Sequence, residues 1–323
     1  MTEAKRKRVE QLSERGYACL RQRQYQSALR IAKRLERLRY SAAFEIAGLA
    51  YAGLDDLPSA VKTLERGVDL APACWLNWQL LGNYQSDLGK YEEAAAAYGK
   101  ALTCPQVWED SVRLNQAILA NRRGDHHGAL AYLDAVKDAD CALEAASVRV
   151  RALEGAGRRD EAVALAERCL ADKWQDDSST DSLAYIAATL ARMRLARGDD
   201  PADVRKFAIY SLESDADNPD LLAIIRELDG RYSPEAQYFR LLVHVRIAEN
   251  DPRYADMKGY FIKYDVVAES VTQALEWVVQ FERLATLDAL SVEEADALEP
   301  RPQSPMGVYW RGDRHSYAAE DAT

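Results

Sequence analysis

The chain has 323 residues, a formal net charge of −10 and 48% hydrophobic residues, a composition typical of a soluble protein with room for two domains. It contains no apolar run long enough to span a membrane and no charged-then-apolar leader. We therefore expect neither membrane insertion nor secretion, and the cytoplasm is the expected location. The five cysteines include no Cys-x-x-Cys pair, which disfavours a zinc site or a disulfide framework and favours buried free thiols.

The first 40 residues are basic, with 12 Lys and Arg against 4 Asp and Glu, although the whole chain is acidic. Arg30, Arg34 and Arg37 recur at helical spacing and are expected to share one helix face. This candidate basic patch suits an acidic protein or nucleic acid. The alternative is a solvated outer face that keeps the end of a repeat array soluble. No aromatic residues alternate with these arginines, which disfavours a binding groove for single-stranded nucleic acid.

A pattern of small, turn-forming and aromatic residues recurs five times from residue 9 onward. The units begin at residues 9, 41, 75, 110 and 143, so the spacings are 32, 34, 35 and 33. A period of this length predicts stacked helical hairpins. We expect a glycine or an aspartate at the turn between the two helices of each unit. The best copy comprises Trp78, Leu81, Gly82, Gly89, Tyr91, Ala94, Tyr98 and Ala101.

These residues resemble the tetratricopeptide repeat (TPR) family over about residues 9 to 176, and more weakly over 184 to 230. The resemblance implies that the first helix of each hairpin lines a concave groove that holds a protein or peptide. The implied partner-binding residues are Tyr17, Leu49, Gln79, Asn83, Asn115, Asn121, Arg151, Tyr185 and Arg192. Ile46, Leu114 and Ile118 occupy further positions of the same groove.

One use of this family is a clamp on the terminal carboxylate of heat-shock chaperones, built from lysines and asparagines on successive repeats. Asn83 and Asn115 match the asparagines of such a clamp. Gln79, Glu144 and Val148 stand where the cations are needed, so a carboxylate would be poorly held. We do not expect a chaperone clamp.

A degraded sixth unit follows, with Gly198 at its turn, Asp200 and Pro201 at a helix start, and Arg194 where an apolar residue is expected. The acidic run from Asp176 to Ser182 predicts an exposed loop before this unit. A closing helix is expected from about Pro219 to Leu228. The predicted fold is mainly α, a solenoid of five to six helical hairpins over residues 1 to 231.

A second domain, residues 236 to 323, is expected because the helical period stops and residues 239 to 247 alternate like a half-buried strand. Residues 260 to 267 predict another strand. Ser270 with Gln273 predicts a capped helix, and Ser291 with Glu294 predicts a second, short one. A last strand is expected at 308 to 310. This order indicates a small α+β domain with an antiparallel sheet, which resembles no family by any motif.

Neither catalytic residues nor a cofactor are expected, because the sequence has no glycine-rich phosphate loop, nucleophile elbow or zinc signature. His126 and His127 are expected in an exposed turn, and His244 on a strand surface, so none predicts a metal ligand. The Arg311-Gly312-Asp313 tripeptide is interpreted as a chance match to an adhesion motif.

Three functions remain for the sequence. The leading hypothesis is a non-catalytic scaffold or adaptor that binds a protein or peptide in the concave groove, with the α+β module as an accessory. The second is a bacterial immunity or regulatory protein that occludes a partner such as a toxin, since an acidic body suits a basic partner. The third is nucleic-acid binding through the basic first hairpin. The partner and the oligomeric state stay open.

Overall fold

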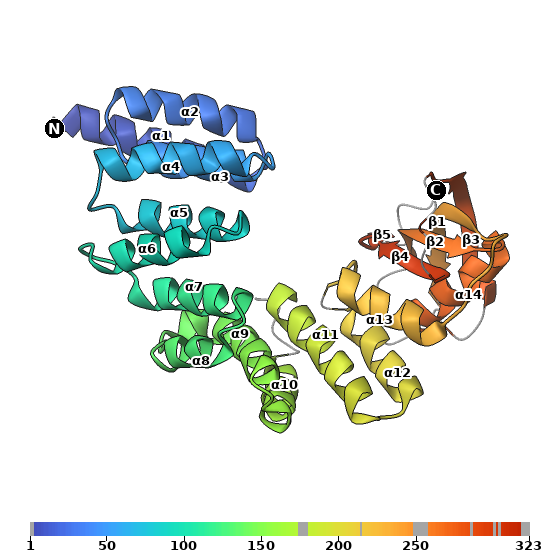
Figure 1. Ribbon diagram of the computed structural model, residues 1–323. Helices are drawn as coiled ribbons and strands as arrows, with labels where there is room; N and C mark the ends of the chain where they lie inside the picture. Colours follow the sequence, from blue (N-terminus) through green and yellow to red (C-terminus); the bar gives the residue numbers. More distant parts are fainter. Residues whose placement is uncertain are drawn as a thin grey trace. The chain divides into compact units, whose positions relative to one another are not determined.

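The computed structural model describes residues 3–173, 180–213, 215–247, 258–284, 287–299, 302 and 305–317. The chain divides into two compact units, Met1–Arg158 (unit 1) and Arg159–Thr323 (unit 2), and each is treated by itself (Figure 1). The four helices between residues 159 and 229 thus share unit 2 with the sheet. The predicted domain limits at residues 231 and 236 stay a prediction.

Unit 1 consists of helices that pack in chain order (Figure 1). The first helices of successive hairpins, α1, α3, α5, α7 and α9, also contact one another, as expected for a solenoid. A short 3-10 turn, Ala139–Cys141, precedes α9. The helices are α1 (Glu3–Arg21), α2 (Tyr25–Arg37), α3 (Ala42–Ala52), α4 (Leu57–Leu70), α5 (Trp75–Asp87), α6 (Tyr91–Leu102), α7 (Glu109–Arg122), α8 (His126–Asp134) and α9 (Ala142–Gly155).

The turns between paired helices confirm the register of the repeat. A residue with positive φ stands at the same turn position in each unit: Arg23, Asp55, Gly89, Gly124 and Gly157, with Gly198 in the sixth. The first five are separated by 32, 34, 35 and 33 residues, the spacings predicted for the repeat starts. Glycine suits this backbone conformation, and Arg23 and Asp55 adopt it without that advantage.

Close contacts between paired helices depend on small residues. A Cβ atom on Gly82 would lie 2.6 Å from the ring of Tyr98, which is 2% exposed and fills the space between α5 and α6. In the second hairpin, Gly48 leaves similar room for Leu64. Aspartates begin two of the second helices, since Asp56 accepts a hydrogen bond from Ser59 N and Asp125 one from Gly128 N.

Unit 2 begins with four helices, α10 (Arg159–Lys173), α11 (Thr180–Arg197), α12 (Pro201–Ser211) and α13 (Pro219–Asp229). The predicted helix start at Asp200 is confirmed, because its carboxylate accepts a hydrogen bond from Ala202 N. Arg194, at a position expected to be apolar, lies 4.7 Å from the ring centre of Phe207 and pairs with Glu167. Of the predicted acidic loop, residues 176 to 179 lie outside the described residues.

A five-stranded antiparallel sheet completes unit 2, in the order β3-β1-β2-β4 with β5 also paired to β2. Helix α14 (Val271–Phe281) packs on the face that carries Leu241, Val243, Ile262 and Tyr264, all fully buried. Its predicted cap is confirmed, since Ser270 Oγ accepts from Gln273 N. The strands are β1 (Gln237–Arg246), β2 (Gly259–Ala268), β3 (Leu290–Ala297), β4 (Gly307–Arg311) and β5 (His315–Tyr317).

The predicted short helix at Ser291 and Glu294 is wrong, because these residues lie in strand β3. A 3-10 turn, Leu287–Ala289, leads into it. Val292 pairs with Val243 of β1, and Ser291 Oγ donates to Glu293 instead of capping a helix. Pairing with a buried strand outweighs a local capping signature. β5 was not predicted.

Candidate protein-interaction surface

The residues expected to line the groove lie on the first helices, but they differ in how much they are covered. Tyr17 and Leu49 are half-buried on α1 and α3. The Tyr17 hydroxyl donates to Glu45 of α3 at 2.6 Å. Burial raises the pKa of Tyr17, and the hydrogen bond to Glu45 raises it further. This contact therefore couples the first two hairpins, while Tyr17 and Leu49 each keep part of their surface exposed.

Four amide side chains in this set contact the chain itself. Gln79, 7% exposed, donates to Ser111 Oγ of α7 at 2.9 Å. Asn83, half-buried, accepts from the Tyr98 hydroxyl at 2.8 Å. Asn115 donates to the carbonyl of Ser111 in its own helix.

Asn121 lies at the end of α7 and is 5% exposed. Its amide donates to Val148 O of α9 at 3.0 Å, and its side-chain oxygen lies 3.1 Å from Nδ1 of His126. His126 and His127 begin α8 and do not form a free turn. Two of the four predicted amides, Gln79 and Asn121, are thus mostly used to join neighbouring hairpins.

The two arginines further along are exposed. Arg151 is exposed on α9. Tyr185 and Arg192 lie on α11 in unit 2, where Tyr185 is half-buried and Arg192 pairs with Asp220 at 2.7 Å. Ile46 and Leu114 are core residues at 0% and 3% exposure, whereas Ile118 is half-buried. Unit 1 therefore presents one row of accessible residues at the same repeat position: Tyr17, Leu49, Asn83, Ile118 and Arg151.

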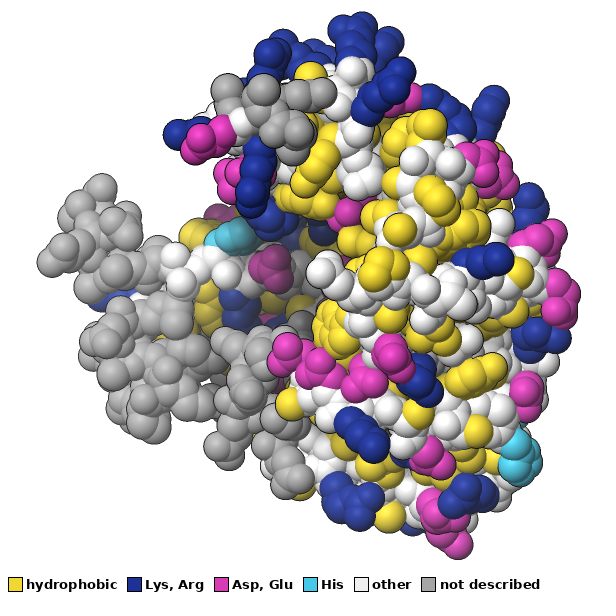
Figure 2. All heavy atoms as spheres, turned by 90° about the vertical axis from the view of Figure 1, so that its left-hand side faces the viewer, with side chains coloured by type: hydrophobic (Ala, Val, Ile, Leu, Met, Phe, Trp, Pro, Cys, Tyr) yellow, Lys and Arg dark blue, Asp and Glu magenta, His cyan; other side chains and the backbone are white. Residues whose placement is uncertain are grey.

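The predicted basic patch is exposed on α2. Figure 2 shows Lys and Arg side chains gathered at the upper end of unit 1, where the first hairpin lies. Two hollows of about 600 and 580 Å³ flank Arg34 and Arg37, and Arg15 of α1 borders both. Arg30 borders the second hollow and donates to Ser27 Oγ. Arg34 and Arg37 make no ion pair within the part of the chain that the structure describes.

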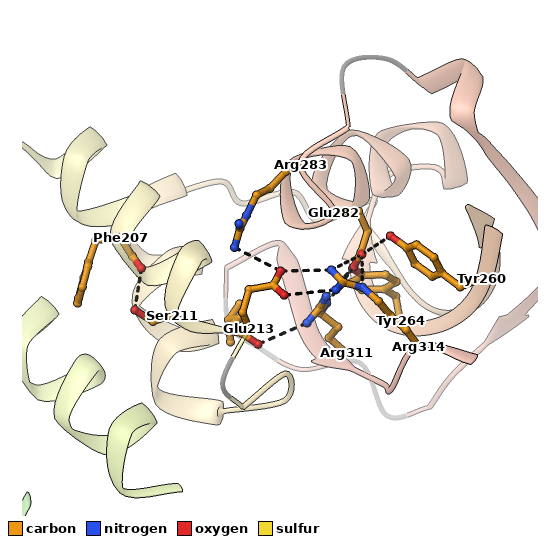
Figure 3. Close-up of polar contacts among 10 residues, drawn as sticks. Phe207, Ser211, Glu213, Tyr260, Tyr264, Glu282, Arg283, Arg311 and Arg314 are labelled. Carbon is orange, nitrogen blue, oxygen red and sulfur yellow. Dashed lines mark hydrogen bonds and ion pairs between the residues drawn. The ribbon is translucent and has the colours of Figure 1, made fainter. Parts of the chain in front are cut away.

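A buried ionic cluster in unit 2 was not predicted from the sequence (Figure 3). The side chain of Glu282, just after α14, is 0% exposed and accepts hydrogen bonds from Arg311, Arg314 and the Tyr260 and Tyr264 hydroxyls. Burial alone would raise the pKa of Glu282, but the charges of Arg311 and Arg314 outweigh it and lower the pKa to about 2. The four donors and the two positive charges therefore keep this buried carboxylate ionised.

The same cluster joins the helices of unit 2 to its sheet. Arg314 and Arg283 both contact Glu213, which follows α12, at 3.2 and 3.3 Å. Arg311 Nη1 donates to Leu212 O at 3.4 Å. Nearby, Arg226 of α13 donates to Val308 O of β4 at 2.6 Å. Because its members are far apart in the chain, no local motif points to this cluster.

Within the described ranges, no group of three or more His, Cys, Asp and Glu side chains is arranged to hold a metal ion. The cysteines are free, and Cys104 and Cys141 are buried while Cys19, Cys74 and Cys169 are partly covered. No helix among the described residues has the length and apolarity to cross a membrane.

This arrangement defines a solenoid of stacked helical hairpins. Residues 77–103 match the family model of the tetratricopeptide repeat. No curated protein matches the chain by sequence.

Solved structures with the same fold cover 68% of this chain at a TM-score of 0.55. A tetratricopeptide repeat protein from Parabacteroides merdae is 13% identical over 85% of its own chain, and PilW, a type IV pilus biogenesis factor, is 16% identical over 98%. The third, from the Cut9-Hcn1 hetero-tetramer of the APC/C, is 13% identical over 42%. The chain thus contains a TPR and has the TPR fold, which is generally a non-catalytic scaffold for protein interactions.

Proposed function

We propose that the chain is a non-catalytic scaffold that holds an extended peptide or protein segment along the first helices of unit 1. The observation that carries this proposal is the accessible row Tyr17, Leu49, Asn83, Ile118 and Arg151, one residue from each successive first helix. Packed helices lie about 8–10 Å apart, and an extended chain rises about 3.3 Å per residue. About every third residue of an extended partner would therefore contact the next hairpin.

The chemistry of the row favours a polarised partner. Tyr17, Leu49 and Ile118 offer aromatic and aliphatic contacts, Asn83 an amide, and Arg151 a guanidinium at the far end. Aromatic and arginine anchors carry much of the energy of recognition. A segment with apolar side chains and an acidic end fits best. Gln79, Asn115 and Asn121 support the helices that present the row, through the hydrogen bonds described above.

The test compares two variants of the full chain. The groove variant combines Leu49→Gln, Ile118→Gln and Arg151→Glu. The control makes matched changes on second helices, Leu70→Gln, Tyr132→Gln and Lys100→Glu, at positions that are also accessible. Both sets change the net charge equally. Partners captured from the native lysate by the parent chain are identified by mass spectrometry and then titrated in purified form.

The groove variant should lose affinity by about tenfold or more, because removing an interface anchor costs more than about 1 kcal/mol each. The control should bind within about twofold, with the helical circular dichroism of all three chains unchanged. Equal binding by the parent and the groove variant would remove the groove from consideration.

For the α+β module we propose an accessory contact to the same partner, in the cytoplasm. This role is best tested by surface substitutions in the full chain. A truncation after residue 231 would separate α12 and α13 from the sheet that contacts Glu213 and Arg226. The occluding role of an immunity or regulatory protein would use the same groove, and the net charge of −10 favours a basic partner for it.

A further inference from the structure

The first hairpin carries two adjoining hollows between α1 and α2. The first hollow is lined by Arg8, Leu12 and Arg15 of α1 and by Arg34, Arg37 and Leu38 next to them on the α2 side. The second hollow shares Arg15, Arg34 and Arg37 and extends past Cys19 and Ile31 to Arg30. We call the two hollows together the end groove. Its aliphatic lining residues, Leu12, Ile31 and Leu38, are half-buried or buried, whereas its arginines are exposed.

The same positions one repeat later show what kind of element fits this face. With the 32-residue interval between Arg23 and Asp55, Leu12 corresponds to Phe44, Arg15 to Ala47 and Arg34 to Arg66. In the second hairpin, Phe44, Ala47 and Arg66 line a hollow whose other wall is Leu29, Ala32 and Lys33 of α2. A helix, α2, therefore covers in the second hairpin the face that forms the end groove in the first.

Helix α2, which covers the second hairpin, also indicates which charge a helix in the end groove would carry. Glu36 of α2 makes an ion pair with Arg66, the residue that corresponds to Arg34. Arg66 also lies 5.8 Å from the ring centre of Phe44. The internal junction is thus closed by an apolar helix face with a glutamate opposite the arginine. At the end groove, Arg34 makes no such ion pair among the described residues.

The charged side chains around the end groove are mostly basic. Arg8, Arg15, Arg30, Lys33, Arg34 and Arg37 line it, and Glu14 is the acidic residue among the lining side chains. The solvent-facing outer side of a repeat array needs polar side chains for solubility, but charges of either sign serve that purpose. In a chain of net charge −10, a basic end is more than solubility requires. Guanidinium groups pair best with carboxylates in a fork geometry.

We propose that the end groove docks an acidic amphipathic helix of a partner protein, stacked on the first hairpin as α2 is stacked on the second. Aliphatic side chains of that helix lie on Leu12, Ile31 and Leu38, and its glutamates or aspartates face Arg15, Arg34 and Arg37. The site is separate from the row on the first helices, so it gives the scaffold a second contact. Nucleic acid fits less well, because no aromatic residue lines the end groove on which bases would stack.

The probe is a labelled helical peptide of about 20 residues with leucines at i, i+3, i+4 and i+7 and glutamates on both flanks. A second peptide has the same composition in an order that breaks the leucine stripe, and a single-stranded DNA oligonucleotide is the third probe. Binding to the full chain is followed by fluorescence anisotropy. The test variant carries Arg15→Glu, Arg34→Glu and Arg37→Glu, and the control carries Lys62→Glu, Lys90→Glu and Lys100→Glu. All six positions are exposed, so the folds should survive.

The amphipathic peptide should bind the parent chain about tenfold more tightly than the peptide without the stripe. The arginine variant should weaken this binding about tenfold or more, and the lysine control should leave it within about twofold. Equal binding of the two peptides, equal loss in both variants, or tighter binding of the DNA would overturn the proposal. So would the absence of saturation by the amphipathic peptide up to the order of 1 mM.

Discussion

In unit 1 neighbouring helices meet through glycine, alanine and aromatic side chains, whereas in unit 2 the last helices meet the sheet through buried charges. Tyr98 of α6 packs against Gly82 of α5, the preceding helix of the same hairpin. Arg314 instead contacts Glu213, 101 residues earlier in the chain. Contacts between near neighbours make stability a sum of local terms. Contacts between distant elements, among them the junction around Glu282, make the helices and the sheet of unit 2 depend on each other.

The largest effect is expected where that junction is broken. Glu282→Gln removes the charge that faces Arg311, whose side chain is 4% exposed, and Arg314. Breaking a buried ion pair from one side costs about 3 to 5 kcal/mol, because the partner charge stays buried. Hydrogen exchange read peptide by peptide should show lower protection over β1, β2 and α12, with α5 and α6 unchanged.

Glu227→Gln is the matched control, because Glu227 is an exposed residue of α13 in the same unit. Its effect should stay within about 0.5 kcal/mol. If the two glutamine variants lose the same protection, the junction at Glu282 does not hold the sheet to the helices.

A smaller loss of folding stability, confined to acidic pH, is expected in the unaltered chain. The pKa of Glu282 is about 2 in the fold and 4.5 for a free glutamate, so the ionised form stabilises unit 2. This stabilisation is complete above about pH 4.5 and disappears as the pH falls toward 2, where the folded state also takes up the proton. The total is on the order of 3 kcal/mol, from the shift in pKa.

Thermal unfolding between pH 5 and pH 2, roughly the range in which carboxylates titrate, measures this term. Unit 2 of the Glu282→Gln variant should show a flatter dependence on pH than unit 2 of the parent chain, since its amide does not titrate. Parallel pH profiles for the two chains would mean that other carboxylates cause the acid loss.

The difference between the units also explains what could be predicted from the sequence. The helices of unit 1 follow from a repeat, because Gly82, Gly89 and Tyr98 perform their packing and turn roles within one period. The helix start at Asp200 and the cap at Ser270 are equally local. Strand β3 was mistaken for a helix because its pairing with β1 lies outside the window in which Ser291 and Glu294 resemble a cap.

The candidate surface residues divide in the same way: the repeat predicts their helix, whereas their exposure depends on contacts outside one repeat. Periodicity places Leu49, Asn83 and Arg151 on first helices, but their exposure depends on neighbours. Gln79 is covered through Ser111 of the next hairpin, which a single repeat does not reveal. Arg311 was interpreted as part of a chance tripeptide, and only the approach of Glu282 and Leu212 makes it a junction residue.

The smallest effects, of opposite sign, are expected from two glycines of one hairpin. Gly82→Ala places a Cβ 2.6 Å from the ring of Tyr98, and overpacking of this kind costs about 1–3 kcal/mol. Gly99→Ala, in the interior of α6, meets nothing within 4 Å and should stabilise by about 0.5–1 kcal/mol, because alanine loses less backbone entropy in a helix.

Urea unfolding of both variants, with hydrogen exchange to locate the change, tests the local character of unit 1. Protection should change in α5, α6 and their neighbours α4 and α7, and unit 2 should keep its own unfolding free energy. The opposite signs separate packing from backbone effects, since both substitutions add the same methyl group to a helix. If Gly82→Ala also lowers protection of the sheet in unit 2, stability in this chain is not a sum of nearest-neighbour terms, and the contrast between the two units fails.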